Sequence, residues 1–134
     1  MHQAINWLAV LVAGFAGFAV GGVWYGPLFA KAWMKERGIT MDAAKKVNMP
    51  LIYGTAFVLN LVMAFMLVHI LGGFHPGSVG HWVIASAVIA LGFVVPAMGV
   101  NYLFSGLSRK LFAIDAGYWI VNFCAMGLII GLLI

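Results

Sequence analysis

The stretch INWLAVLVAGFAGFAVGGVWY, residues 5–25, contains no Asp, Glu, Lys or Arg. A hydrocarbon core about 30 Å thick is crossed by about 20 apolar residues in a helix, so this stretch is long enough to span a membrane. Three runs of similar length and hydrophobicity follow it, at residues 50–71, 81–104 and 114–134. They are continuous and lack the alternation of barrel strands. The sequence therefore predicts an all-α integral membrane protein with four transmembrane helices.

Composition supports the same class of protein. Hydrophobic residues make up 65% of the chain and charged residues 7%, whereas a typical soluble domain has about 45–50% and about 25%. A soluble domain of 134 residues cannot bury so much apolar surface. We therefore expect a single lipid-embedded domain over residues 1–134. Cys124 is the single cysteine, so an intrachain disulfide is impossible.

The basic residues predict the orientation of this domain. All seven lie in two of the three loops, namely the loop after the first span and the loop after the third. They are Lys31, Lys35, Arg37, Lys45, Lys46, Arg109 and Lys110. Loops rich in Lys and Arg face the cytoplasm, so we expect a multi-pass inner-membrane protein with both termini outside. Because topology accounts for the net charge of +4, we expect no nucleic-acid partner.

The first cytoplasmic loop has a helical pattern of its own. Pro27 suits the first turn of a helix and Gly38 suits its end. Between them, Trp33 and other apolar residues fall on one face and lysines on another, which is typical of a short amphipathic helix at the membrane interface. Thr40 is a candidate cap for a second short helix that ends near Lys46. Such elements either anchor the bundle or bind a partner.

Glycines at helical spacing predict close helix packing. They lie on one face of the first span and again in the fourth, at Gly14, Gly17, Gly21, Gly127 and Gly131. Gly22 and Gly26 add a second spacing of this type. Small residues let membrane helices approach closely, either within one chain or between chains. Four short spans enclose little interior and glycines lie on more than one face, so we favour a homo-oligomer surrounded by membrane lipids.

A further set of residues places polar groups at membrane depth. Asn60 lies about 15 Å into the second span and Asn122 about 12 Å into the fourth, where an unpaired amide is costly. We expect the two amides to pair with each other or with backbone. With neighbours toward the cytoplasmic end they form a candidate polar pocket, which comprises Trp24, Tyr25, Tyr53, Asn60, Asn101, Asp115, Tyr118 and Asn122. These side chains either hold helices together or form a ligand or solute site.

Asp, Glu, Lys and Arg are absent from the middle of every predicted span. Proton-coupled carriers rely on intramembrane carboxylates or histidines. The small multidrug-resistance exporters also have four spans, but they keep a glutamate in the first span that this chain lacks. A small-solute channel or facilitator needs no such group and remains the alternative to a protein without transport activity. Pro96 is expected to kink the third span.

No catalytic pattern occurs in the sequence. It has no nucleophile–base pair, phosphate-binding glycine loop or HExxH motif, so we expect neither enzyme activity nor a cofactor. His69, His75 and His81 lie at the predicted outer side and are weak candidates for a metal site, because imidazole binds copper, nickel and zinc. Their spacing matches no metal motif, so interfacial histidines are the simpler interpretation.

Two stretches carry a family resemblance. The first span ends in Trp24-Tyr25-Gly26-Pro27, preceded by Gly21-Gly22 and followed by Lys31 and Trp33, and the fourth begins with Ile114-Asp115-Ala116-Gly117-Tyr118. In this order and on this hydropathy profile they resemble the bacterial membrane-protein family named domain of unknown function 1761. The resemblance covers essentially the whole chain. It implies a small helical membrane protein and supplies no activity or catalytic residues.

The pattern of that family draws attention to Asp115 and to the junction at Trp24 and Tyr25. We expect the two aromatic residues to anchor at headgroup level. Asp115 is expected at a helix N-terminus, where negative charge is favoured, with Arg109 or Lys110 as its partner. The sequence thus predicts a small non-enzymatic inner-membrane protein that self-associates through glycine-rich faces, with a solute facilitator as the alternative and outward metal binding as a weaker one.

Overall fold

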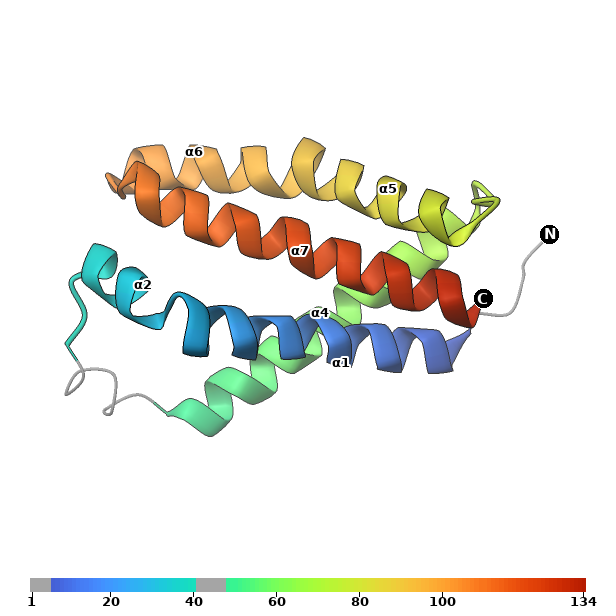
Figure 1. Cartoon of the computed structure of the whole chain (residues 1–134), viewed down its shortest axis with the longest axis horizontal. Helices are drawn as coiled ribbons and strands as arrows, with labels where there is room; N and C mark the ends of the chain where they lie inside the picture. Colours follow the sequence, from blue (N-terminus) through green and yellow to red (C-terminus); the bar gives the residue numbers. More distant parts are fainter. Residues whose placement is uncertain (1–5, 41–47) are drawn as a thin grey trace.

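The computed structural model describes residues 6–40 and 48–134 and confirms the all-α architecture. Within these residues, four helical segments are long and apolar enough to cross a membrane: Trp7–Leu28, Met49–Gly72, Val79–Ser105 and Arg109–Leu133. Three of them run along the long axis of the molecule, and Met49–Gly72 crosses them obliquely (Figure 1). The first and last segments meet at one end of the bundle, where Asn6 Nδ2 donates to Leu133 O at 3.1 Å. The chain is therefore a multi-pass membrane protein.

Each long helix begins at a side-chain cap. The helices are α1 (Trp7–Val23), α4 (Met49–Gly72), α5 (Val79–Ile89) and α7 (Arg109–Leu133), and their caps are Asn6, Asn48, Ser78 and Ser108. In each case the side-chain oxygen accepts a hydrogen bond from the backbone N–H three residues later, at 3.0 to 3.2 Å. This bond satisfies one of the free donors at a helix start. The caps explain where the helices begin better than hydropathy does.

The fourth span begins earlier than predicted. The sequence analysis placed its start at Ile114, whereas α7 begins at Arg109. The prediction assigned Arg109 and Lys110 to a loop because they are charged. Both are exposed in the first turn of α7, where long basic side chains extend toward the headgroups. Asp115 therefore lies in the second turn, about 9 Å along the helix, and not at its N-terminus.

The first span passes directly into the surface helix. A wide π-helical turn, η1 (Trp24–Leu28), contains Pro27 and extends α1. The predicted surface helix exists as α2 (Ala30–Arg37). It begins after Pro27, so the assignment of that proline to its first turn was wrong. Gly38 ends α2 with φ +67°, as predicted. Most of the second helix predicted in this loop lies in residues 41–47, outside the described residues.

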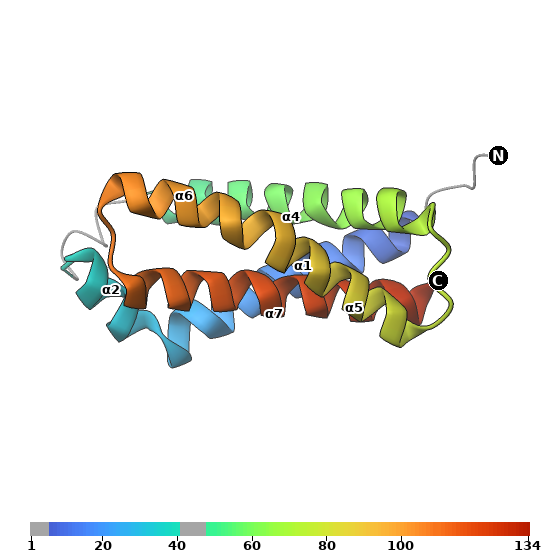
Figure 2. The same cartoon turned by 90° about the horizontal axis from the view of Figure 1, so that it is seen from above.

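The third span is broken in the middle, as Pro96 predicted. It consists of α5, a second π-helical turn η2 (Ala90–Val94) and α6 (Val95–Ser105). Figure 2 shows the change of direction between α5 and α6. Pro96 has no backbone N–H to donate to the preceding turn. The π-helical turn η2 immediately before it accommodates the missing hydrogen bond by widening the helix.

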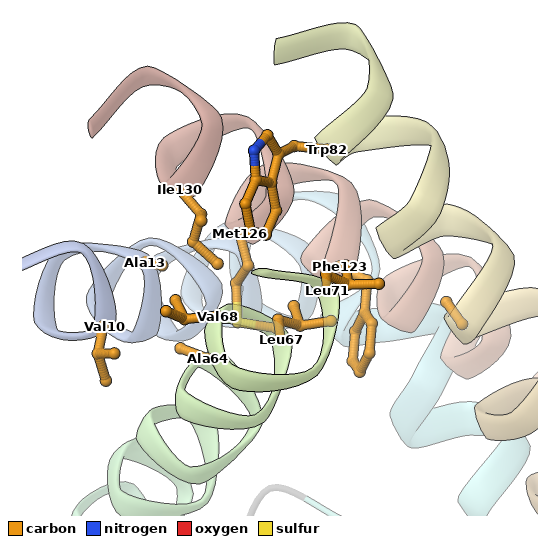
Figure 3. Close-up of a cluster of buried hydrophobic side chains, with 11 residues drawn as sticks. Val10, Ala13, Ala64, Leu67, Val68, Leu71, Trp82, Phe123, Met126 and Ile130 are labelled. Carbon is orange, nitrogen blue, oxygen red and sulfur yellow. The ribbon is translucent and has the colours of Figure 1, made fainter. Parts of the chain in front are cut away.

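The helices pack around α7. Both α1 and α5 pack extensively against α7, while α4 packs mainly against α1 and meets α5 and α7 at few positions. The apolar core lies toward the end where α1 starts and α7 ends (Figure 3). All four long helices contribute to it, with side chains that include Ala13, Leu67, Trp82 and Met126. Among the described residues, the buried Asp115 lies nearer the α2 end, Asn60 and Asn122 lie at mid-depth, and Ser86 lies beside the apolar core.

Candidate functional site

Three predicted polar residues form one buried cluster between α1, α4 and α7. Asn122 Nδ2 lies 3.0 Å from Asn60 Oδ1 and 2.9 Å from Tyr118 Oη. It also lies 3.4 Å from Gly17 O on α1. Asn60 Nδ2 donates to Ala56 O one turn earlier in α4, at 2.9 Å. The pairing of the two amides agrees with the prediction, and it ties three helices together at mid-depth.

Gly17 makes this cluster possible. A Cβ atom at this position would lie 2.5 Å from Asn122 Oδ1 and 2.7 Å from Asn60 Oδ1, closer than real Cβ atoms approach. Both amide oxygens therefore occupy space that any other residue would fill. Asn122 Oδ1 is fully buried and receives no hydrogen bond from the described residues. The cluster is thus packed by contact with Gly17, and a solute cannot occupy that space without displacing the amides.

Asp115 is the centre of a second polar contact, nearer the basic end. It is buried, and Tyr25 Oη donates to its Oδ1 at 2.5 Å. Tyr102 of α6 donates to the other carboxylate oxygen. The predicted partners Arg109 and Lys110 are exposed instead. Two phenols therefore supply the hydrogen bonds that a buried carboxylate requires, and they tie the first and third spans to the fourth.

The two stretches that carry the family resemblance form one contact. Trp24 Nε1 donates to Ile114 O at 3.0 Å. Its indole also lies over Gly117, where a Cβ atom would be 3.0 Å from Trp24 Cζ2. Tyr25 follows with its hydrogen bond to Asp115 and an edge-on ring contact to Tyr118 at 5.1 Å between centroids. Residues distant in sequence are thus joined, and the anchoring of the two aromatic residues at headgroup level stays a prediction.

Two predicted pocket residues lie elsewhere. Tyr53 is 54% exposed and makes an edge-on contact with Phe18. Asn101 is exposed on α6. Sequence position placed them at the correct depth, but depth says nothing about which side of a helix faces the interior. The predicted eight-residue pocket is therefore reduced to six residues in two groups, which touch where the Tyr25 ring meets the Tyr118 ring.

Sequence reasoning missed two contacts at this end. Tyr102 was not among the predicted polar residues, although its hydroxyl donates to Asp115 and its ring packs on Phe112 with centroids 5.6 Å apart. Ser108 donates to Glu36 Oε2 at 2.7 Å and so joins α2 to the start of α7. Gly106, with φ +68°, ends α6 and lets the chain turn back onto α7. This glycine was the sequence signal from which the contact between Tyr102 and Asp115 could have been predicted.

The five predicted packing glycines already pack against other helices of the same chain. A Cβ at Gly14 would lie 2.6 Å from Leu61, and a Cβ at Gly127 would lie 2.5 Å from Ser86 Oγ. Gly21 and Gly131 likewise lie against neighbouring helices, near Tyr118 and Val79. Gly22 and Gly26 are different, because a Cβ at either would meet nothing within 4 Å. Of the glycines that the sequence analysis singled out for packing, only Gly22 and Gly26 leave room for another molecule to approach.

An apolar groove of about 480 Å³ runs along the outside of α1 and α7. Its residues include Ala16, Ala19, Val20, Val23, Val121 and Ala125, and it continues to Leu28 at one end and Leu128 at the other. Small side chains form much of its floor. The groove contains no charged or amide side chain, and Trp24, whose indole donates to Ile114 O, is one of its lining residues.

The three histidines have separate surroundings. The His69 ring stacks on Phe65 with centroids 5.8 Å apart, and His81 Nδ1 lies 3.0 Å from Ser78 Oγ. His75 lies in the turn between α4 and α5 with φ +52°. In the part of the chain that the structure describes, no three His, Cys, Asp or Glu side chains come together as metal ligands would.

Comparison with known proteins agrees with the resemblance seen in the sequence. No curated protein and no solved structure gives a significant match to the chain. One family model does match, and it covers residues 8–131, which include both stretches that meet at Trp24 and Asp115. The chain therefore belongs to the family described as protein of unknown function DUF1761.

Proposed function

We propose that this protein is a non-enzymatic membrane protein that self-associates through the groove between α1 and α7. The observation that carries the proposal is the groove itself, which is apolar, floored by small residues and unoccupied by any part of the chain that the structure describes. The glycines and amides inside the bundle are already engaged with one another. Association must therefore use an outward face.

The length of the groove favours a helix as its occupant. From Ala16 to Leu28 it follows the first span for about 18 Å, at 1.5 Å per residue. Asn122 lies beside Gly17 and the two helices are antiparallel, so Val121 is level with Phe18, and α7 carries the groove beyond Ala16 to Ile129 for about 9 Å more. The groove thus extends over most of the roughly 30 Å hydrocarbon core, whereas an acyl chain of one leaflet reaches only about half of it.

Small residues support close approach of that helix. Ala19, Gly22, Val23 and Gly26 follow one another along the outward side of the first span, and a Cβ at Gly22 or Gly26 meets nothing within 4 Å. Membrane helices associate where small residues let their backbones approach. A second copy, inserted in the same orientation, presents the same face, so a two-fold dimer is the simplest assembly.

The distribution of burial supports association as well. Within the most apolar window of Val79–Ser105 only 11% is buried inside the chain, against 39% for Arg109–Leu133. In water such exposure would be prohibitive, but in lipid it leaves faces free for protein contacts. The described basic residues lie at the end of the bundle that carries α2 and the α6–α7 turn. We propose that this end is cytoplasmic and that the protein lies in the inner membrane with both termini outside.

The test is crosslinking in native membranes. In a Cys124→Ala background, Ala19→Cys should give a disulfide-linked dimer on mild oxidation, because a two-fold axis brings the two copies of this position together. Ala97→Cys on the outward side of α6 is the matched control and should remain monomeric. Ala19→Leu should fill the groove, and native mass spectrometry should then detect monomer, while Ala97→Leu keeps the dimer.

Two results would reject the proposal. A wild-type protein that is monomeric in lipid nanodiscs would reject self-association altogether. A dimer that survives Ala19→Leu unchanged would place the interface elsewhere. A monomer that retains a lipid in the groove would identify an acyl chain as its occupant.

A small-solute facilitator remains the second candidate. It is favoured by the buried polar groups that run from Asp115 through Tyr118 to Asn122, with an unsatisfied oxygen at mid-depth. Asn60→Leu and Asn122→Leu should then abolish solute flux in proteoliposomes and leave assembly intact. Loss of folding in both variants would instead support a role in holding the helices together.

A further inference from the structure

The cytoplasmic end of the described structure carries a concentration of positive charge. Five basic side chains are exposed there, on α2 and on the first turn of α7: Lys31, Lys35, Arg37, Arg109 and Lys110. The two elements are held together by the hydrogen bond from Ser108 to Glu36. The basic residues of both elements therefore belong to one surface, which we call the basic surface.

The acidic groups of the described residues do not neutralise this surface. Asp115 is buried and receives hydrogen bonds from two tyrosines. Glu36 accepts the hydrogen bond from Ser108 and faces α7. Lys31 and Lys35 are one turn apart on the exposed side of α2, and like charges at this spacing repel each other. An anionic partner would remove that repulsion.

The position of the basic surface relative to the membrane indicates which partner. The first span ends at Leu28, which is 60% exposed, and Lys31 follows about one turn later. Trp24 and Trp33 flank this junction, and Arg37 lies over the Trp33 ring at 5.8 Å. Aromatic rings of this kind lie at the level of the lipid headgroups. The cations are therefore at the level where phosphates of the cytoplasmic leaflet lie.

We propose that the basic surface binds the headgroup of an anionic phospholipid in the cytoplasmic leaflet, with Lys31, Lys35 and Arg37 as its main contacts. Clusters of basic residues directly beside a membrane span attract anionic lipids. Each cation contributes about fivefold to the affinity, so the three together contribute about a hundredfold. This proposal does not depend on self-association, since the groove on α1 and α7 contains none of these residues.

The test compares lipids that differ only in the headgroup. The purified protein in a neutral detergent is titrated with phosphatidylglycerol or with phosphatidylcholine of the same acyl chains, and the temperature of unfolding is measured. Phosphatidylglycerol should raise the unfolding temperature at lower concentrations than phosphatidylcholine, because a ligand that binds the folded state stabilises that state by mass action. Inorganic phosphate at the same concentration should have no such effect.

Variants identify the residues. The triple variant Lys31→Gln, Lys35→Gln, Arg37→Gln should need about a hundredfold more phosphatidylglycerol for the same rise in unfolding temperature. The charge-preserving variant Lys31→Arg, Lys35→Arg should behave as wild type. Without added lipid the charge-preserving variant should unfold like wild type, and the triple variant should lose only the exposed contact of Arg37 with the Trp33 ring. Equal stabilisation by the two lipids, an equal effect of inorganic phosphate, or an unchanged response of the triple variant would each overturn the proposal.

Discussion

Gly17 offers the sharpest test of how this bundle is held together. In Gly17→Ala the new Cβ would lie 2.5 Å from Asn122 Oδ1 and 2.7 Å from Asn60 Oδ1. Neither amide can retreat freely, because Asn122 is fully buried and Asn60 is 3% exposed. The methyl group must therefore separate the two side chains or push α1 away from α4 and α7.

The cost of this substitution can be worked from its parts. Overpacking of a close contact costs about 1–3 kcal/mol. Loss of the hydrogen bond between the two amides adds about 0.6–2 kcal/mol, the range measured for polar contacts between membrane helices. Alanine favours the helix over glycine by up to about 1 kcal/mol. Gly54→Ala in α4 is the matched control, because it gains the same helix propensity, its Cβ meets nothing within 4 Å, and it lies outside the groove. Relative to that control, Gly17→Ala should lose about 2–4 kcal/mol.

The assay is reversible unfolding by sodium dodecyl sulfate in mixed micelles, followed by tryptophan fluorescence. Gly17→Ala should unfold at a lower detergent fraction than wild type, whereas Gly54→Ala should unfold at the same or a higher fraction. Equal stability of the two variants would refute the close contact of Gly17 with the two amides. Asn122→Ala combined with Gly17→Ala should cost less than the sum of the two changes, since the methyl group then has room.

Three further predictions use the same unfolding assay or a simple topology test. Tyr25→Phe should destabilise the protein by about 1.5–3 kcal/mol because it removes a donor to the Asp115 carboxylate. Tyr53→Phe is the control and should have almost no effect on stability, because that residue is exposed. Equal effects of the two substitutions would argue against the Asp115 contact. Ser86→Ala should leave stability unchanged or raise it by about 1 kcal/mol, since its buried hydroxyl has no partner among the described residues, and a large loss would show that the hydroxyl is bonded. A reporter fused after Ile134 should be active only on the outer side of the membrane, and activity confined to the cytoplasm would reverse the proposed orientation.

The fold was predictable because hydropathy and length are sufficient for a membrane helix. Four runs with almost no charge have few alternatives when each must satisfy its own backbone in lipid. The start of α7 was missed for the same reason, since hydropathy excludes Arg109 and Lys110 although a helix end tolerates them. A serine before two basic residues, here Ser108, is the cap signal that hydropathy overlooks.

The site was predictable only where depth alone decided the contact. Asn60 and Asn122 had to find partners near the midplane, and they bond to each other as well as to Ala56 O and Tyr118 Oη. Tyr53 and Asn101 had the correct depth but faced outward, because the rotation of a helix cannot be read from a sequence that is apolar on every side. The same limit applies to glycine spacing, which indicates a close contact without saying which helix supplies the other half.

The way the interior is built decides where function must be sought. Gly17, Asn60 and Asn122 depend on one another for space, and Asp115 depends on Tyr25 and Tyr102 for hydrogen bonds. Where a substitution at any of them changes folding and activity together, the loss of activity does not identify a site. The outward groove and the basic surface are different, since Ala19, Val121 and Leu128 of the groove and the cations of the basic surface are exposed. A change that alters association or lipid binding there without altering the unfolding of the isolated protein would therefore report function alone.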